Sequence, residues 1–459
     1  MRFLFTRIDY ERSRAMPYDP RRMGLDRMRR LLDRLGNPHR DLPLVHVAGT
    51  KGKGSTAAMI AAVLSAAGHP TGLFTSPHLH GIEERLIVDG LPCKPDELVE
   101  LLQQVRPAVE AMDLEAAAEG PDGTGPTYFE ITTAMALLHF VRRGVAAAVL
   151  EVGLGGRLDA TNVCTPRVSV ITSISFDHTQ QLGNTLAAIA REKAGIVKSG
   201  VPVVSGVVEP EPRDVIRETC RRQGSRLIER GADFDFDYQP PRHVERSAAA
   251  GRIQYRTPQA SESYDLSLLG RHQAANAATA LAALAELRRI GWHLPDAAVR
   301  HALASLTWPG RVEVVSRRPA VVLDAAHNVA SIAALVNTLD ESFTVARRLL
   351  VFATTQDKDH RGMLAQLLDR FDEVFFTQYR TNPRAVPPEE LQALAVELTG
   401  RRWPIYHDPA AAWAAARAKA TEDDLICVTG SFFIVAEVPL AASQCPVADV
   451  AKPQAARPT

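Results

Sequence analysis

The chain has 459 residues, of which 46% are hydrophobic and 23% are charged, a composition typical of a soluble enzyme with two or three domains. Its 53 Lys plus Arg residues equal its 53 Asp plus Glu residues, so no general basic field is available to hold nucleic acid or an anionic membrane. We therefore expect neither of these partners.

The compartment is predicted from what the sequence lacks. Residues 1–16 carry several charges and no apolar core of the length that a signal peptide needs, and no stretch approaches the ~20 apolar residues of a membrane helix. The five cysteines are scattered without a C-x-x-C pair, which is typical of free thiols in a reducing compartment. We expect a cytoplasmic protein.

Short β-branched runs alternate with longer helical patterns, which predicts an α/β fold with doubly wound parallel sheets. The predicted strands are Leu44–Ala48, Ala147–Val152, Val168–Thr172, Val201–Gly206, Ala320–Asp324, Leu349–Ala353, Val374–Thr377 and Leu425–Val428. The predicted helices are Ser55–Ala67, Asp96–Met112, Tyr128–Arg143, Gln273–Arg289, Ile332–Leu339 and Pro388–Thr399.

Breaks in this pattern predict the domains. Residues 115–126 are expected to form a loop, and residues 233–269 a small antiparallel excursion. The breakers Trp308-Pro309-Gly310 precede a second strand–helix series. We expect an N-terminal ATP-binding domain over residues 1–308, a smaller C-terminal α/β domain over 309–442, and a disordered tail over 443–459.

The segment Gly49-Thr50-Lys51-Gly52-Lys53-Gly54-Ser55 follows a buried strand and opens an apolar helix. That context is the one a phosphate-binding loop requires, because glycines let backbone N–H groups converge on phosphate and the helix N-terminus adds positive charge. Lys53 reaches the outer phosphates as a point charge. Gly54 stands where the general pattern has the Ser or Thr that holds Mg²⁺, so the hydroxyl ligand is expected elsewhere.

Further motifs follow in order, and together with the loop they resemble the folylpolyglutamate synthase / dihydrofolate synthase family of Mur-type ATP-dependent amide ligases. The resemblance spans about Gly24 to Glu437, with Val329 where relatives have proline. The motifs are Thr75-Ser76-Pro77-His78-Leu79, Thr127-Tyr128-Phe129-Glu130, Glu151-Val152-Gly153-Leu154-Gly155-Gly156-Arg157-Leu158-Asp159-Ala160-Thr161-Asn162, Asp177-His178-Thr179, Arg191-Glu192-Lys193-Ala194-Gly195-Ile196, Pro309-Gly310-Arg311 and Asp324-Ala325-Ala326-His327-Asn328.

The resemblance implies a reaction and its ligands. A folate-type carboxylate, dihydropteroate or a reduced folate, takes the γ-phosphate of ATP, and the amine of L-glutamate then displaces phosphate. The implied cofactors are ATP and Mg²⁺, as two ions, with carbamylated Lys193 as a further anionic ligand. The enzyme is expected to be a monomer.

The resemblance also implies roles for individual residues. Lys53, His178 and Lys193 are implied to be catalytic, and Ser76, Glu151 and His178 to bind the metal. The implied nucleotide contacts are Lys51, Gly52, Lys53, Gly54, Ser55, Asn276, Arg311, Asp324 and His327. The implied acceptor contacts are Thr127, Tyr128, Phe129, Glu130, Leu158, Asp159 and Ala160.

Structural interpretations of several of these residues stay open. Tyr128 and Phe129 suit a helix core, Lys193 a solvated helix face, and Asn276 an exposed amide. The loop Gln356–Asp359 suits contact with glutamate or nucleotide as well as it suits a solvated turn. Another Mur-type ligase and a P-loop NTPase without ligase activity are the alternative functions.

Overall fold

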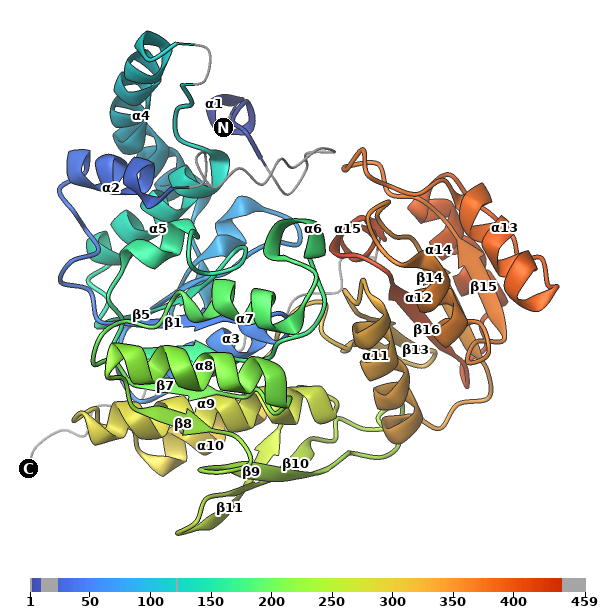
Figure 1. The fold of residues 1–459 in the computed structure, drawn as a ribbon. Helices are drawn as coiled ribbons and strands as arrows, with labels where there is room; N and C mark the ends of the chain where they lie inside the picture. Colours follow the sequence, from blue (N-terminus) through green and yellow to red (C-terminus); the bar gives the residue numbers. More distant parts are fainter. Residues whose placement is uncertain (1, 10–23, 121–122, 440–459) are drawn as a thin grey trace, which may run out of the picture.

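The computed structural model describes residues 2–9, 24–120 and 123–439, whose strands form three sheets flanked by helices (Figure 1). The largest sheet has eight strands in the order β4-β3-β2-β5-β1-β6-β7-β8. Strands β2, β5, β1, β6, β7 and β8 run parallel, and at one edge β3 pairs antiparallel with both β2 and β4. The strands are β1 Leu44–Ala48, β2 Thr71–Phe74, β3 Leu86–Val88, β4 Leu91–Pro92, β5 Ala147–Glu151, β6 Val168–Ile171, β7 Val203–Ser205 and β8 Leu227–Glu229.

Helices cover both faces of this sheet. The core on one face contains α3, α9 and α10, and the cores on the other face contain α2, α4 and α5 and α7 and α8. The helices of this part of the chain are α1 Arg2–Phe5, α2 Leu25–Arg34, α3 Lys53–Ala66, α4 Pro95–Ala118, α5 Tyr128–Arg142, α6 Thr179–Leu182, α7 Leu186–Ala194, α8 Pro210–Gln223, α9 Arg271–Arg289 and α10 Asp296–Ser305, with 3₁₀ turns η1 Ile82–Arg85 and η2 Ala160–Val163.

Local sequence explains where these elements form. Strand β1 is Leu-Val-His-Val-Ala and is buried along its whole length, as expected of a parallel strand covered on both faces. Helix α5 begins after Thr127, whose side chain accepts from the Glu130 amide in a capping box. Helix α8 ends at Gly224 in the left-handed conformation that favours glycine.

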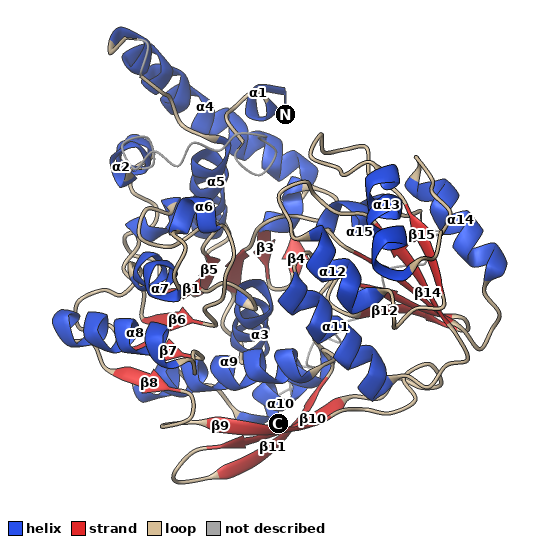
Figure 2. Ribbon diagram, turned by 45° about the vertical axis from the view of Figure 1, so that its right-hand side comes forward, coloured by secondary structure: helices blue, strands red, loops and turns tan. Residues whose placement is uncertain are grey.

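The excursion is an antiparallel sheet of β9 Asp235–Gln239, β10 Gly251–Arg256 and β11 Ser261–Leu266. Figure 2 shows it beside α9 and α10, and residues of β9, β10 and β11 belong to the same hydrophobic core as these helices. The segment between β9 and β10 also contacts the C-terminal part: Val244 N donates to Ser342 O at 3.0 Å, and Thr344 N donates to Glu245 Oε2 at 3.2 Å.

A five-stranded sheet, in the order β12-β13-β16-β14-β15, contains only strands from Glu313 onward. Its strands are β12 Glu313–Arg317, β13 Ala320–Leu323, β14 Arg348–Phe352, β15 Glu373–Phe376 and β16 Leu425–Thr429, and all but β12 are parallel. Its helices are α11 Val329–Ser342, α12 His360–Leu367, α13 Pro388–Thr399, α14 Pro409–Lys419 and α15 Phe432–Glu437. Helices α11 to α13 share one core and α14 and α15 the other.

The structure confirms the predicted α/β class, the antiparallel excursion, and all eight predicted strands to within two residues. Part of the loop predicted over 115–126 is wrong, because α4 continues to Ala118. Three alanines favour helix there, and Glu115 accepts from Arg30 and Arg34 of α2. The predicted tail over 443–459 lies outside the described residues.

Two further observations concern compartment and membrane. Cys93, Cys164, Cys220 and Cys427 are free thiols and buried, as expected, while Cys445 lies outside the described residues. Over the described part of the chain, no helix combines the length and apolar character needed to cross a bilayer.

Candidate active site

The loop after β1 is shaped by two glycines with positive φ. Gly49 has a φ of 151° and Gly52 a φ of 80°, a backbone geometry that other residues rarely adopt. A Cβ on Gly49 would lie 1.9 Å from Thr172 Oγ1, and a Cβ on Gly52 would lie 2.1 Å from Asn276 Oδ1. Glycine is therefore required here both for backbone shape and for close packing.

The loop is held by the segment that follows β6. Thr50 N donates to Ser173 O at 2.7 Å, Lys51 N donates to Ser173 Oγ at 3.0 Å, and Thr172 Oγ1 donates to Lys51 O at 2.6 Å. These contacts define the loop without a ligand. They place Gly52 at the N-cap of α3, where the first free N–H groups of the helix face outward.

Gly54 lies in the first turn of α3, next to a buried carboxylate. A Cβ on Gly54 would lie 3.3 Å from Glu151 Oε2, closer than Cβ atoms usually approach, so a serine or threonine here would crowd Glu151. Glu151 ends β5 and is 5% exposed, and Ser76 N donates to its Oε2 at 3.0 Å. The structure thus brings Ser76 and Glu151 together at the carboxyl ends of β2 and β5.

Burial raises the pKa of Glu151, against the opposing influence of Lys53 and Arg311. A carboxylate and a serine side by side are hard oxygen ligands suited to Mg²⁺. A bound cation would compensate the charge of the Glu151 carboxylate, which is costly to bury alone. Ser76 and Glu151 are therefore suited to the predicted metal, whereas the contacts of His178 described below are with Asp177.

Lys193 lies at the end of α7 and is 4% exposed. Its Nζ donates to Gly49 O in the phosphate loop at 2.8 Å. Burial first, and Lys53 second, hold the pKa of Lys193 well below its usual value. The solvated interpretation of this lysine is therefore wrong, and a neutral amine, which carbamylation requires, is favoured.

Asp177 and His178 follow β6 on one loop. His178 has a φ of 49°, and its Nε2 lies 3.9 Å from Asp177 Oδ1. Burial first, and nearby lysines next, lower the pKa of His178 to about 4 despite Asp177. The imidazole is therefore neutral near pH 7, the form that binds metals.

Arg311 and Asp324 bring the C-terminal part to the site. Asp324 is buried and accepts from Val312 N and Ala326 N at 2.9 Å each. The Arg311 guanidinium lies 4.6 Å from the centroid of the Phe432 ring. Its pKa is lowered by burial and raised in part by Asp324 and Glu151, so Arg311 is the cation close to both carboxylates.

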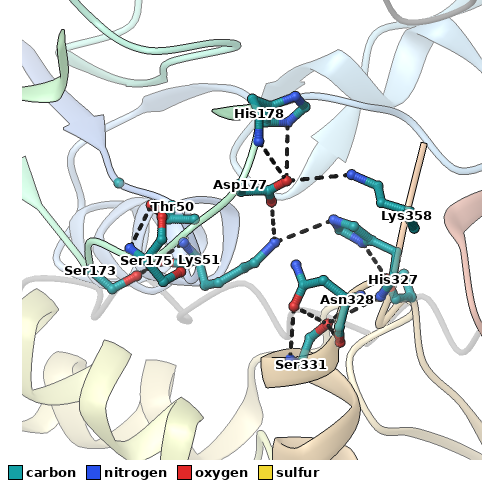
Figure 3. Close-up of polar contacts among 12 residues, drawn as sticks. Thr50, Lys51, Ser173, Ser175, Asp177, His178, His327, Asn328, Ser331 and Lys358 are labelled. Atoms are coloured by element: carbon teal, nitrogen blue, oxygen red, sulfur yellow. Dashed lines mark hydrogen bonds and ion pairs between the residues drawn. The ribbon is translucent and has the colours of Figure 1, made fainter. Parts of the chain in front are cut away.

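The phosphate loop and the His327 loop touch each other (Figure 3). His327 Nε2 lies 3.4 Å from Lys51 Nζ, and His327 Nδ1 lies 2.9 Å from Ala325 O. Because a carbonyl oxygen only accepts, Nδ1 carries the proton and Nε2 offers a lone pair to Lys51. Burial lowers the pKa of His327 well below its usual value, which agrees with a neutral ring.

The predicted acceptor segments have structural partners of their own. Thr127 and Glu130 form the cap of α5, and Arg27 Nε donates to both oxygens of Glu130. Asp159 caps η2 and accepts from Leu154 N and Thr161 N. Tyr128 is 2% exposed, in agreement with the core interpretation. These contacts explain the residue types, and acceptor binding by these segments stays a prediction.

Sequence reasoning gave no role to Ser173 and Asp177, and it left the Gln356–Asp359 loop, which contains Lys358, open between ligand contact and a solvated turn. Ser173 holds the phosphate loop, and Asp177 pairs with Lys51 Nζ at 2.5 Å. Lys358, from the loop whose role was open, lies 3.4 Å from Asp177 and is therefore not merely solvated. The available signals were that Asp177 precedes His178 in the Asp177-His178-Thr179 motif and that Lys358 lies in a charged loop after a predicted strand.

Comparisons with known proteins agree with this architecture. The family model described as "Mur ligase middle domain" matches residues 97–284, and "Mur ligase, glutamate ligase domain" matches residues 310–432. The dihydrofolate synthase/folylpolyglutamate synthase of Bacillus subtilis is 36% identical over 421 residues, covering 90% of this chain and 94% of the relative. The Mycobacterium tuberculosis protein of the same name is 38% identical and covers 82% and 78%.

Solved structures extend the likeness to three dimensions. Mycobacterium tuberculosis folylpolyglutamate synthase complexed with ADP superimposes with a TM-score of 0.83 at 33% identity, covering 95% of both chains. Escherichia coli FolC in complex with DHPP and ADP gives a TM-score of 0.76 at 34% identity, covering 90% of this chain and 91% of that one. The shared sheets, the ordered motifs and these near full-length matches place the chain in the dihydrofolate synthase/folylpolyglutamate synthase family of Mur-type ligases.

Proposed function

We propose that this chain uses ATP to activate the carboxylate of a folate-type acid and then joins it to L-glutamate. The observation that carries the proposal is the meeting of the two sheets at one site. A phosphate-binding loop after β1 is covered by the loop after β13, with Lys51 Nζ and His327 Nε2 3.4 Å apart. A site assembled from both parts can enclose a reactive intermediate that water would otherwise destroy.

ATP is bound between the two parts. The residues proposed to contact its phosphates are Lys51, Gly52, Lys53, Gly54 and Ser55, at the N-terminus of α3, where free N–H groups and lysines favour anions. Asn276 touches this loop at Gly52. Arg311, Asp324 and His327 are the proposed nucleotide contacts from the C-terminal part, with Asp324 accepting from a ribose hydroxyl.

Ser76, Glu151 and His178 are the residues proposed to hold Mg²⁺, which when bound neutralises charge between phosphate and the attacking carboxylate. Ser76 already contacts Glu151, and His178 is neutral at pH 7. Buried Lys193, whose pKa burial holds well below its usual value, is the proposed site of carbamylation, which would turn the amine into an anionic ligand. Mass spectrometry of the intact protein prepared with bicarbonate detects this modification; an unmodified mass under those conditions argues against it.

The acceptor is proposed to contact Thr127–Glu130 and Leu158–Ala160. One acceptor carboxylate oxygen attacks the γ-phosphorus and the bond to the bridging oxygen of ADP breaks. The glutamate amine then attacks the acyl carbon, loses a proton, and the carbon–oxygen bond to phosphate breaks. Lys53 and Arg311 stabilise the negative charge that accumulates.

The test is ADP release with labelled glutamate. Each acceptor, dihydropteroate or tetrahydrofolate, is offered alone and with glutamate, and product is separated by chromatography. We expect ADP formation and label transfer only when acceptor and glutamate are both present. ATP hydrolysis indifferent to both would refute the ligase proposal, and the acceptor that gives label transfer decides between the two activities.

The described residues supply all the proposed site groups from one chain, so we also propose that the enzyme acts as a monomer. Light scattering on the purified protein tests this. A dimer mass at assay concentrations would refute it.

A further inference from the structure

A single carboxylate pairs with one lysine from each side of the site. Asp177 Oδ2 lies 2.5 Å from Lys51 Nζ of the phosphate loop, and Asp177 Oδ1 lies 3.4 Å from Lys358 Nζ, which follows β14. His327 Nε2 completes the group at 3.4 Å from Lys51 Nζ. We call these four residues the interdomain bridge (Figure 3).

The bridge is an ordered arrangement and not a surface ion pair. The side chains of Asp177 and Lys358 are 10% and 12% exposed, and His178 N donates to Asp177 Oδ1 at 3.0 Å, which fixes the carboxylate to its own loop. Burial opposes ionisation, but Lys51, His178 and Lys358 together hold the pKa of Asp177 below its usual value. Partly desolvated ion pairs with hydrogen bonds are stronger than exposed ones.

The interdomain bridge carries more positive than negative charge, which favours the binding of an anion. Two ammonium groups face one carboxylate. Burial first, and then Lys358 and Lys53, lower the pKa of Lys51 to about 8 although Asp177 opposes them. Lys51 belongs to the loop that is proposed to bind phosphate. An arriving phosphate group therefore competes with Asp177 for the same lysine.

We propose that Asp177 is a positioning residue for the ligase reaction: it holds Lys51 and Lys358 together across the two domains before ATP binds, and phosphate then takes its place. The inference rests on the proposed function. It has two opposite consequences. Asp177 opposes nucleotide binding, because it competes for Lys51, and it supports turnover, because it places Lys358 at the phosphate loop.

The first test is Asp177→Asn, which keeps the shape of the side chain and removes its charge. Calorimetry with AMPPCP in the absence of Mg²⁺ separates the competition from any effect on metal binding. We expect binding about three- to tenfold tighter than in the wild type, the size of one ion pair. In the ADP-release assay with Mg²⁺, the same variant is expected to show a lower kcat. A purely structural defect would weaken binding as well.

The second test is a double-mutant cycle with Lys358→Gln. If Asp177 acts on turnover through Lys358, the two single variants lower kcat, and the double variant is no slower than the worse of them. Lys419→Gln is the matched control, because Lys419 pairs with Glu373 at 2.7 Å within the C-terminal part. This control is expected to change neither binding nor kcat.

Weaker Mg²⁺-free binding of AMPPCP by a folded Asp177→Asn protein would overturn the inference, as would kcat losses that multiply in the double variant. Asp177→Ser serves if the asparagine variant fails to fold. The two proposals fail separately. Wild-type protein that binds AMPPCP but shows no glutamate-dependent turnover refutes the ligase proposal, whereas turnover with unchanged binding in Asp177→Asn refutes only the positioning role.

Discussion

Gly52 has both a positive φ and a close contact with Asn276, and mutation can separate the two effects. Gly52→Ala places a side chain at a φ of 80° and 2.1 Å from Asn276 Oδ1, whereas Gly68→Ala meets the same unfavourable φ, of 87°, with nothing within 4 Å. The unfavourable φ alone is expected to cost each variant about 1–2 kcal/mol of stability, and the close contact with Asn276 adds to this cost in Gly52→Ala. Only Gly52→Ala is expected to weaken ADP binding, by about tenfold or more, as measured by calorimetry. Equal binding by the two variants would show that the close packing at Gly52 has no role.

Lys53 is the first residue of α3 and is proposed to bind the outer phosphates. We expect Lys53→Ala to lower kcat for ADP release by at least about 100-fold, because a preorganised positive charge at the phosphates is lost. The thermal midpoint should stay close to that of the wild type. Lys419→Ala is the control, and near-normal turnover of the Lys53 variant would refute the phosphate-loop assignment.

Some site residues could be predicted from the sequence and others could not. The phosphate loop was predictable because its function is carried by backbone geometry within a few consecutive residues. Lys358 was not, because its contact with Asp177 joins residues 181 positions apart. Asp159 presents a different difficulty. Its motif predicts contact with the acceptor, yet its side chain also caps η2, and the sequence alone cannot distinguish the structural role from a binding role.

A buried carboxylate, that of Asp424, lies directly before the central strand β16 of the C-terminal sheet. Asp424 precedes β16, its side chain is 0% exposed, and it pairs with Arg347 at 2.7 Å while accepting from Thr421 N at 2.7 Å. We expect Asp424→Asn to destabilise the protein by about 1–3 kcal/mol, since the buried donors lose a charged acceptor. Chemical denaturation measures this, and Glu422→Gln, on an exposed neighbour, is the control.

The loss of stability expected for Asp424→Asn should become smaller at acid pH. Burial opposes ionisation of Asp424, but Arg347 and Thr421 outweigh it and lower its pKa in the folded state. A lowered folded pKa contributes stability that is complete above the usual carboxyl pKa of about 4 and is lost as pH falls below it. The gap between wild type and Asp424→Asn should therefore be constant from pH 7 to about 5 and shrink below about 4. A gap that widens in acid would contradict this account.

Elements were predictable where local pattern and tertiary packing agree. The buried parallel strands are near-continuous apolar runs, so β1 and β5 were placed almost to the residue. Strand β7 is shorter than predicted, Val203–Ser205, because Pro202 has no N–H to donate to a neighbouring strand. The predicted end of α4 was wrong because the glycines and prolines after Ala118 outweighed its three alanines, and no local pattern reveals the contacts of Glu115 with arginines of α2.

In the whole molecule, the excursion also contacts the C-terminal part, besides the connector between α10 and β12 and the interdomain bridge. Arg317 of β12 donates to Ser247 O at 3.1 Å and to Val244 O, so the excursion binds the C-terminal part. We expect Arg317→Ala to increase hydrogen exchange in residues 306–312 and to raise KM for ATP more than it lowers kcat. Arg318→Ala, whose guanidinium is 66% exposed, is the control. Unchanged exchange would argue against this role of the excursion.

The excursion at residues 243–247 and the connector at 306–312 attach the C-terminal part at two points in addition to the interdomain bridge. If the interdomain bridge opens when phosphate takes the place of Asp177, these two points remain, and a rotation about the line that joins them is the movement that keeps both intact. Groups far from that line travel furthest for a given angle. A small rotation about these two attachments would therefore produce its largest displacement at the contacts that lie furthest from them.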